Sequence, residues 1–214
     1  MSLLLDQIAD KTLTSEVLFK KVEKDFTLVP VLLEGITSTK ATVRYTCARV
    51  LVDLSGAYPE NLYNYINHFI ELLESNYRII KWNAMAIIAN LASVDKNKVL
   101  DDNFDKYFGL LHDGYMVTLA NLAGYSSKIG LAKPYLANLV AHELLKVENI
   151  TLTPNLTEEC KRVIAEKAIN SFDLMFSLFD EKTKTQVLSF VNKQLESSRE
   201  SLKRKAKTFA LKWG

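Results

Sequence analysis

Three histidines and two cysteines are the residues of this sequence that could hold a metal ion or act as nucleophiles. His68, His112 and His142 lie far apart, and none of them belongs to a cluster with the Cys/His spacing of a zinc site. The chain also lacks a Gly-rich phosphate loop, a Gly-x-Ser-x-Gly elbow and a Cys-x-x-Cys pair. We therefore predict that the protein is not an enzyme and has no catalytic residue, no metal ligand and no cofactor.

The stretch from Arg199 onward concentrates positive charge. It contains six lysines and arginines against one acid, Glu200, whereas the whole chain has a net charge of +2. The candidate basic patch consists of Arg199, Lys203, Arg204 and Lys207. Three interpretations are open: the solvated face of a capping helix, contacts with nucleic-acid phosphates, or contacts with an acidic protein or membrane surface through Leu202, Phe209 and Trp213.

The elements that must position these residues come from one helix pattern that recurs along the chain. Residues 43–55 and 80–92 both open with an aliphatic residue and a cation, followed by a small residue, an aliphatic pair and a leucine, and they start 37 residues apart. Weaker copies lie in residues 117–130, 164–176 and 202–211. Such self-similarity is typical of stacked helical units that bury apolar surface against their neighbours. Because no alternation of period two persists, we predict an all-α protein.

This pattern resembles the second helix of a HEAT repeat, as in Val43-Arg44, Cys47-Ala48, Val50-Leu51 and Leu54-Ser55. The similarity spans roughly residues 26 to 213, and armadillo-like arrays share the pattern. The resemblance implies a right-handed α-α superhelix, a solenoid of about five helix pairs, with the second (B) helices lining its concave side. It also implies a scaffold that binds other macromolecules. The recurring cations Arg44, Lys81 and Lys203 are then expected to form ion pairs between neighbouring repeats. The pair His142-Glu143 is similar to the pairs of metal-binding HEAT hydroxylases, which need several of them, so we expect a capping or exposed pair here.

We predict a single repeat domain over residues 1–214, with capping helices in 1–25, repeats in 26–197 and a basic C-terminal helix in 198–214. The segment 148–157 is the one long interruption.

Cys47 and Cys160 occupy small-residue positions of helical patterns, so we expect two buried free thiols. No apolar run is long enough to span a membrane, and residues 1–6 do not form a secretory signal. These features favour a cytoplasmic protein.

The side chains between the apolar stripes predict the partner-binding surface. If the B helices line the concave side, its floor is formed by Tyr45, Arg49, Asp53, Trp82, Asn83 and Asn90. Aromatic residues and arginine dominate the affinity of protein interfaces, so this floor suits a protein or peptide. Trp82 is followed four residues later by Ala86, so the tryptophan–asparagine ladder of importin-type proteins is absent. Whether Trp82 belongs to the core or to the surface is open at this point.

We therefore expect a non-enzymatic protein-binding scaffold. The alternative is a nucleic-acid-binding protein, similar to the HEAT-like DNA alkylation-repair proteins, that uses the C-terminal cations. A third possibility is a structural element that forms homo-oligomers through an open end of the stack. The sequence does not identify the partner or the oligomeric state.

Overall fold

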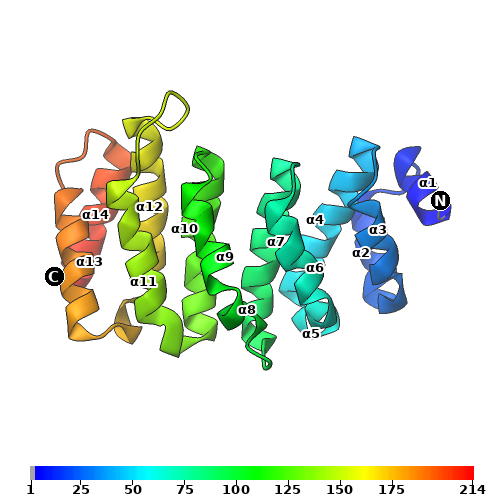
Figure 1. The fold of residues 1–214 in the computed structure, drawn as a ribbon, viewed down its shortest axis with the longest axis horizontal. Coiled ribbons are helices and arrows are strands. Elements are labelled where there is room, and N and C mark those ends of the chain that lie inside the picture. The colour runs from blue at the N-terminus through cyan, green and yellow to red at the C-terminus, as the bar shows by residue number, and fades with distance from the viewer. Residues whose placement is uncertain (1–2) are drawn as a thin grey trace. The chain divides into compact units, whose positions relative to one another are not determined.

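The computed structural model describes residues 3–214, which form helices joined by short turns (Figure 1). These residues contain no β-strand, and an isolated backbone bridge joins Thr153 to Leu156 in a loop. The chain divides into two compact units, Met1–Asn103 and Phe104–Gly214, which we call unit 1 and unit 2 and describe separately. The all-α prediction is confirmed, and the single domain stays a prediction.

In unit 1, long helices alternate with shorter, broken ones. The long B-type helices are α2 (Ser15–Lys24), α4 (Ala41–Ala57) and α7 (Arg78–Leu91), and they pack in this order, α2 on α4 and α4 on α7. The A-type elements between them are η1 (Phe26–Leu28), α3 (Val29–Gly35), α5 (Pro59–Leu62), η2 (Tyr63–Tyr65), α6 (Ile66–Glu71) and η3 (Leu72–Glu74). The remaining elements are α1 (Leu3–Ala9), η4 (Ala92–Val94) and α8 (Val99–Asp102). The first two copies of the sequence pattern are thus α4 and α7.

Helix ends in unit 1 follow local sequence signals. The Thr14 hydroxyl accepts a hydrogen bond of 3.3 Å from the backbone N–H of Val17 and caps α2. Pro30 lies in the first turn of α3, where its missing N–H leaves no bond unmade. Gly56 lies inside α4 and does not end it. That helix ends at Ala57 because Pro59 cannot continue it.

The A-type element of residues 59–74 is broken into α5, η2, α6 and η3 rather than forming one helix. The apolar residues Leu62, Ile66 and Phe69 keep helical spacing and are buried. Because spacings of three and four residues both keep side chains on one side, the pattern does not reveal a local tightening into a 3-10 turn. With α7 the segment makes a unit of three α-helices, and HEAT and armadillo repeats contain two or three.

Unit 2 has the same alternation. Its B-type helices are α10 (Met116–Ala132), α12 (Glu158–Met175) and α14 (Glu200–Trp213), and α12 packs on both of the others. The remaining elements are α9 (Phe104–Phe108), η5 (Gly109–His112), η6 (Pro134–Leu136), α11 (Ala137–Leu145), η7 (Lys146–Asn149), η8 (Phe176–Leu178) and α13 (Glu181–Lys193). The three weaker copies of the pattern are therefore also helices.

Small residues bring α10 and α12 close together. A Cβ atom added to Gly130 would lie 2.1 Å from the sulfur of Met175. The buried hydroxyl of Ser171 donates a hydrogen bond to the backbone carbonyl of Ala123 on the neighbouring helix. The helix backbones approach because these positions carry little or no side chain.

The predicted interruption between the repeats is present. After η7 the chain runs through a loop to Thr157, whose hydroxyl accepts a hydrogen bond of 3.4 Å from the backbone N–H of Cys160 and caps α12. Within residues 3–214, no helix combines the length and the apolar character that crossing a bilayer requires.

Candidate functional site

The candidate residues of unit 1 lie on α4 and α7. Arg49 and Asp53 are exposed and Tyr45 is half-buried on α4, whereas Trp82 and Asn90 are half-buried on α7. Spacings of four residues place Tyr45, Arg49 and Asp53 along one side of α4. We call Tyr45, Arg49, Asp53, Trp82 and Asn90 the α4–α7 strip.

Two contacts hold α4 and α7 in register. At the C-terminal ends, the amide Nδ2 of Asn90 donates a hydrogen bond of 2.9 Å to the buried hydroxyl of Ser55. At the N-terminal ends, the guanidinium carbon of Arg44 lies 3.8 Å from the centre of the Tyr77 ring. The two helices therefore run parallel and pack on each other, side by side in Figure 1.

Arg44 is buried, which removes it from the surface. Its Nη1 donates a hydrogen bond of 2.7 Å to the carbonyl of Ser38, and its guanidinium also lies over the Tyr45 ring at 4.8 Å. The expected inter-repeat ion pair is therefore wrong for Arg44. The contact with the next repeat is a cation–π contact with Tyr77, because the preceding turn places an aromatic ring and not a carboxylate beside the guanidinium.

Asn83 and Trp82 differ in their surroundings. Asn83 lines a cavity of about 10 Å³ together with core residues such as Ile80 and Leu51, so part of its side chain faces the interior. Trp82 is half-buried, so it contributes both to packing and to the accessible surface. Both side chains are thus partly accessible, and Asn83 also borders the interior.

Two exposed apolar residues next to the strip were missed by the sequence reasoning. Tyr77 is 47% exposed and Ile79 is 42% exposed, at the start of α7. Ile79 precedes Trp82 by three residues and therefore lies on the same side of the helix. Both residues lie just before the repeated pattern of residues 80–92, so they are apolar side chains without a core position in that pattern, which was the available signal.

The C-terminal basic patch is partly neutralised in unit 2. The Arg199 guanidinium pairs with Glu159 and with Glu166, whose Oε2 lies 3.2 Å from Nε. The hydrogen bond from Arg199 is the main reason that the pKa of Glu159 lies below its usual value. Among residues 3–214, Arg204 and Lys207 have exposed side chains and no ion pair.

Lys203 and Lys212 are also paired. Lys203 lies 3.6 Å from Glu196 in the turn before its own helix, so this ion pair is local and not the expected contact between repeats. Lys212 Nζ lies 2.8 Å from Oδ1 of Asp173 on α12, and the indole N–H of Trp213 donates to the same oxygen at 2.7 Å. Only part of the charge on α14 is therefore available to a partner.

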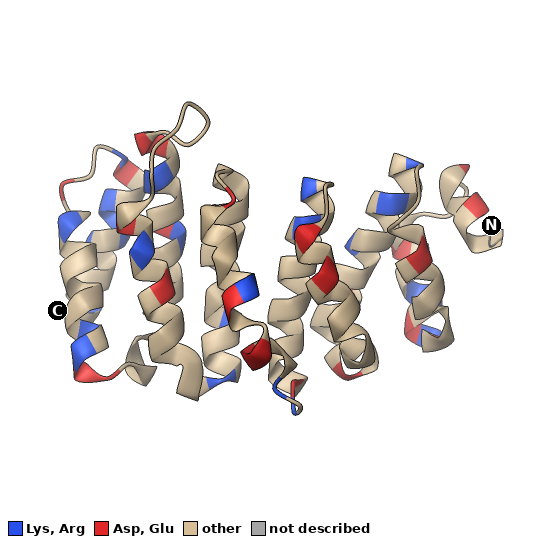
Figure 2. Cartoon of the chain, viewed as in Figure 1, with Lys and Arg blue, Asp and Glu red and all other residues tan. Residues whose placement is uncertain are grey.

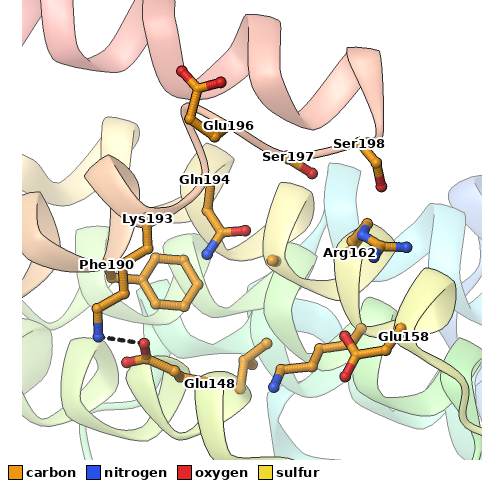
Figure 3. Close-up of a pocket in the computed structure, with 12 residues that line it drawn as sticks. Glu148, Glu158, Arg162, Phe190, Lys193, Gln194, Glu196, Ser197 and Ser198 are labelled. Atoms are coloured by element: carbon orange, nitrogen blue, oxygen red, sulfur yellow. Dashed lines mark hydrogen bonds and ion pairs between the residues drawn. The ribbon is translucent and has the colours of Figure 1, made fainter.

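A cavity of about 400 Å³ lies between the start of α12 and the end of α13 (Figure 3). Acidic and basic side chains line it in similar number, above the buried ring of Phe190. Lys193 pairs with Glu148 at 2.5 Å, and Arg162 pairs with Glu159 at 3.3 Å. Because these charges largely neutralise one another, the cavity shows no preference for an anion or a cation.

The histidines and cysteines make local contacts. His142 Nε2 lies 3.3 Å from the hydroxyl of Thr183, and Glu143 pairs with Lys146 at 2.6 Å. Both cysteines are free thiols; burial raises the pKa of Cys47 to about 12, whereas Cys160 is only half-buried, so the prediction of two buried thiols holds for Cys47 alone. Within residues 3–214, no group of three or more His, Cys, Asp or Glu side chains could hold a metal ion.

The fold is similar to that of designed armadillo repeat proteins. The designed armadillo repeat protein YIII(Dq)4CqI superposes with a TM-score of 0.55 at 17% identity, over 98% of this chain and 90% of that chain. The designed armadillo repeat protein YIII(Dq.V1)4CPAF, in complex with the peptide (KR)4, gives a TM-score of 0.57 at 17% identity with the same coverage. An engineered protein gives a TM-score of 0.50 at 18% identity, over 97% of this chain and 86% of that chain.

No protein-family model matches the chain, and no curated protein matches its sequence. The structural similarities show an all-α repeat-solenoid fold, like that of the armadillo repeat proteins. At these identities they establish the fold alone, and the predicted resemblance is confirmed at that level.

Proposed function

We propose that the protein is a non-enzymatic scaffold that binds a protein or peptide partner along the α4–α7 strip. The observation that carries this proposal is that the α4–α7 strip is a preformed surface with aromatic and charged residues. Trp82 and Tyr45 are half-buried aromatic residues of the strip, and Arg49 is an exposed cation one helical turn from Tyr45 on α4. Such residues dominate the affinity of protein interfaces.

The rigidity of the strip supports the same function. The Arg44–Tyr77 and Ser55–Asn90 contacts tie the two helices at both ends, so binding needs little ordering of the scaffold. The likeness in fold to a designed repeat protein that holds a peptide supports a peptide-sized partner. A nucleic-acid partner receives less support, because phosphate binding grows with the number of available cations and much of the charge on α14 is already paired.

Selection of peptides from a random 12-residue display library tests the proposal. We expect enriched peptides to bind the wild type and to lose about tenfold or more in affinity for an Arg49→Ala/Trp82→Ala double variant, since truncation of interface anchors costs at least 1–2 kcal/mol. The matched control is Lys96→Ala, which truncates an exposed side chain of unit 1 outside the strip. Peptides that bind the double variant as tightly as the wild type would contradict the proposed surface.

A further inference from the structure

The C-terminal helix α14 is rich in positive charge. Its residues 201–214 contain five lysines and arginines and no acid, and Glu200 is the acid that opens the helix. Figure 2 shows lysine and arginine in blue on this helix. Two of the five cations form ion pairs, whereas Arg204 and Lys207 are exposed and form no ion pair with any residue that the structure describes. The helix therefore keeps positive charge that the fold does not neutralise.

These two cations share one side of α14 with an exposed leucine. Lys207 follows Arg204 by three residues and Leu211 follows Lys207 by four, so the three side chains lie along one stripe of the helix. Leu202 and Phe209, which α14 buries, lie on the opposite side. The side chain of Leu211 is 90% exposed. We call Arg204, Lys207 and Leu211 the α14 outer face, in which a solvated apolar side chain neighbours unpaired cations.

The apolar residues that the sequence offers for contact with a membrane are different ones. Leu202 and Phe209 belong to the core of unit 2, so that interpretation is wrong for these two residues. The Trp213 ring packs on the Phe176 ring, with 4.8 Å between the ring centres. Leu211 is therefore the apolar side chain that α14 presents together with its free cations.

We infer that the α14 outer face docks on an anionic lipid surface. Arg204 and Lys207 pair with the phosphate and carboxylate groups of the lipid heads, and Leu211 enters the apolar boundary beneath them. The contact is peripheral and reversible, because the apolar side of α14 is occupied by the core of unit 2. This face lies on α14 and the α4–α7 strip on other helices, so the inference does not depend on the proposed peptide binding.

A bilayer fits this face better than other polyanions do. Affinity for a nucleic acid grows with the number of phosphate contacts, and a phosphate backbone offers no apolar layer to Leu211. Lysine is depleted at the core of protein interfaces, which disfavours an acidic protein as the partner of Lys207. A bilayer with anionic lipids supplies both the negative charge and the apolar layer within reach of a single helix face.

Co-sedimentation of the full chain with large unilamellar vesicles tests the inference. One vesicle preparation is pure phosphatidylcholine, and the other also contains phosphatidylserine at about 30%. At about 0.1 M NaCl we expect at least tenfold stronger partition onto the vesicles with phosphatidylserine. Raising the salt to about 0.5 M should remove most of this difference, because charges at a surface are screened.

Removal of the two cations tests their part in docking. Arg204→Gln/Lys207→Gln should weaken partition onto the phosphatidylserine vesicles about 25-fold, since each cation near such a surface contributes about fivefold. Lys21→Gln/Lys96→Gln is the matched control, because it removes the same net charge from exposed sites of unit 1. This control should change the partition by less than about twofold, because distant charges are screened.

A second pair of variants tests the leucine. Leu211→Ser should weaken partition onto the phosphatidylserine vesicles about threefold or more, because it removes the side chain that leaves water on docking. Leu3→Ser is the matched control: Leu3 is 76% exposed on α1, and its replacement should leave the partition unchanged. Circular dichroism melts show whether each variant is folded.

The outcomes separate a bilayer from other partners. Equal partition onto both kinds of vesicle, or a double glutamine variant that partitions like its control, would overturn the inference. A duplex DNA of about 20 base pairs and poly-glutamate serve as competing polyanions. If either binds through Arg204 and Lys207 while the vesicles do not, the face belongs to a nucleic acid or an acidic protein and the inference fails. Wild-type partition of Leu211→Ser would overturn the entry of the leucine into the bilayer.

Discussion

The guanidinium of Arg44 lies against the ring of Tyr77, with 3.8 Å between the guanidinium carbon and the ring centre, and this contact joins two successive repeats of unit 1. Arg44 Nε is buried without a hydrogen-bond partner within residues 3–214, and the rings of Tyr77 and Tyr45 lie over the guanidinium, while its Nη1 donates to the carbonyl of Ser38. The usual role of a repeated cation, pairing with a carboxylate, is here performed by aromatic rings.

This contact predicts energetic coupling between Arg44 and Tyr77. Cation–π pairs contribute about 0.5–1 kcal/mol when exposed and about 2 kcal/mol when desolvated, so the coupling energy should fall in this range. Urea unfolding of Arg44→Ala, Tyr77→Ala and the double variant measures it as a double-mutant cycle. Additive effects of the two substitutions would show that the ring does not stabilise the cation.

The close approach of α10 and α12 predicts opposite effects for two glycines of the same helix. Gly130→Ala should destabilise unit 2 by about 1–3 kcal/mol, because the new methyl group would overlap the sulfur of Met175. Gly124→Ala should stabilise it by up to about 1 kcal/mol, because no atom lies within 4 Å of the added carbon and alanine favours the helix. Chemical denaturation of both variants checks the sign of each change.

Met175→Ala provides a control for this prediction. If the overlap is the cause, the Gly130→Ala substitution should cost less in a Met175→Ala background than in the wild type. An equal cost in both backgrounds would point to a different origin.

The two thiols should differ in reactivity. Cys47 is fully buried against Gly35 and burial raises its pKa to about 12, so its reactive thiolate is scarce at pH 8. Cys160 is half-buried near the start of α12. We expect iodoacetamide to modify Cys160 in the folded protein and Cys47 only after unfolding, as read by peptide mass spectrometry. Modification of both at one rate in the native protein would contradict this.

The attachment of α14 to α12 should weaken in acid. Burial raises the pKa values of Glu166 and Asp173, but hydrogen bonds from Ser201 and Arg199 to the first, and from Lys212 and Trp213 to the second, leave both below their usual values. A carboxyl group with a lower pKa in the folded state stabilises that state above its unfolded pKa, and the stabilisation is lost as the pH falls through the folded pKa. Unit 2 should therefore lose stability as the pH falls below roughly 4.

Tryptophan fluorescence can follow unit 2 alone. The chain has two tryptophans, so a Trp82→Phe background leaves Trp213, which lies on α14 itself, as the reporter. In that background, Asp173→Asn should lower the melting temperature at pH 7 and reduce its further decrease between pH 5 and pH 3. Asp105→Asn, which removes an exposed carboxylate of α9, should preserve the parent pH dependence.

The B-type helices could be predicted from the sequence because their function in the fold is packing, and packing leaves a repeated apolar pattern. Their observed bounds, such as Ala41–Ala57 for α4, extend the predicted stretch of residues 43–55 by two residues at each end. The breaks in the A-type element could not be predicted, since a 3-10 turn preserves the apolar spacing. The boundary between the units at Asn103 also lacks a glycine- or proline-rich linker that would mark it.

The candidate surface was predicted less completely than the fold. Helical spacing correctly places Arg49 and Asp53 in solvent, but it does not show that Asn83 borders an internal cavity or that Asn90 bonds to Ser55. These properties depend on which neighbouring helix lies beside α7, and the spacing within one helix does not contain that information. The burial of Arg44 has the same origin, because Tyr77 comes from the turn that precedes the next B-type helix.

The pairing of α14 at both ends has a mechanical consequence. At the start of α14, Arg199 donates a hydrogen bond to Glu166 of α12. In the last turn of α14, Lys212 and Trp213 donate hydrogen bonds to Asp173 of α12. Because α14 is bonded to α12 at two separated points, it cannot rotate about its own axis without breaking one of these contacts. The side chains of Arg204 and Lys207 therefore stay on the solvent-exposed side of α14. The backbone amide hydrogens of these two residues should exchange slowly with solvent.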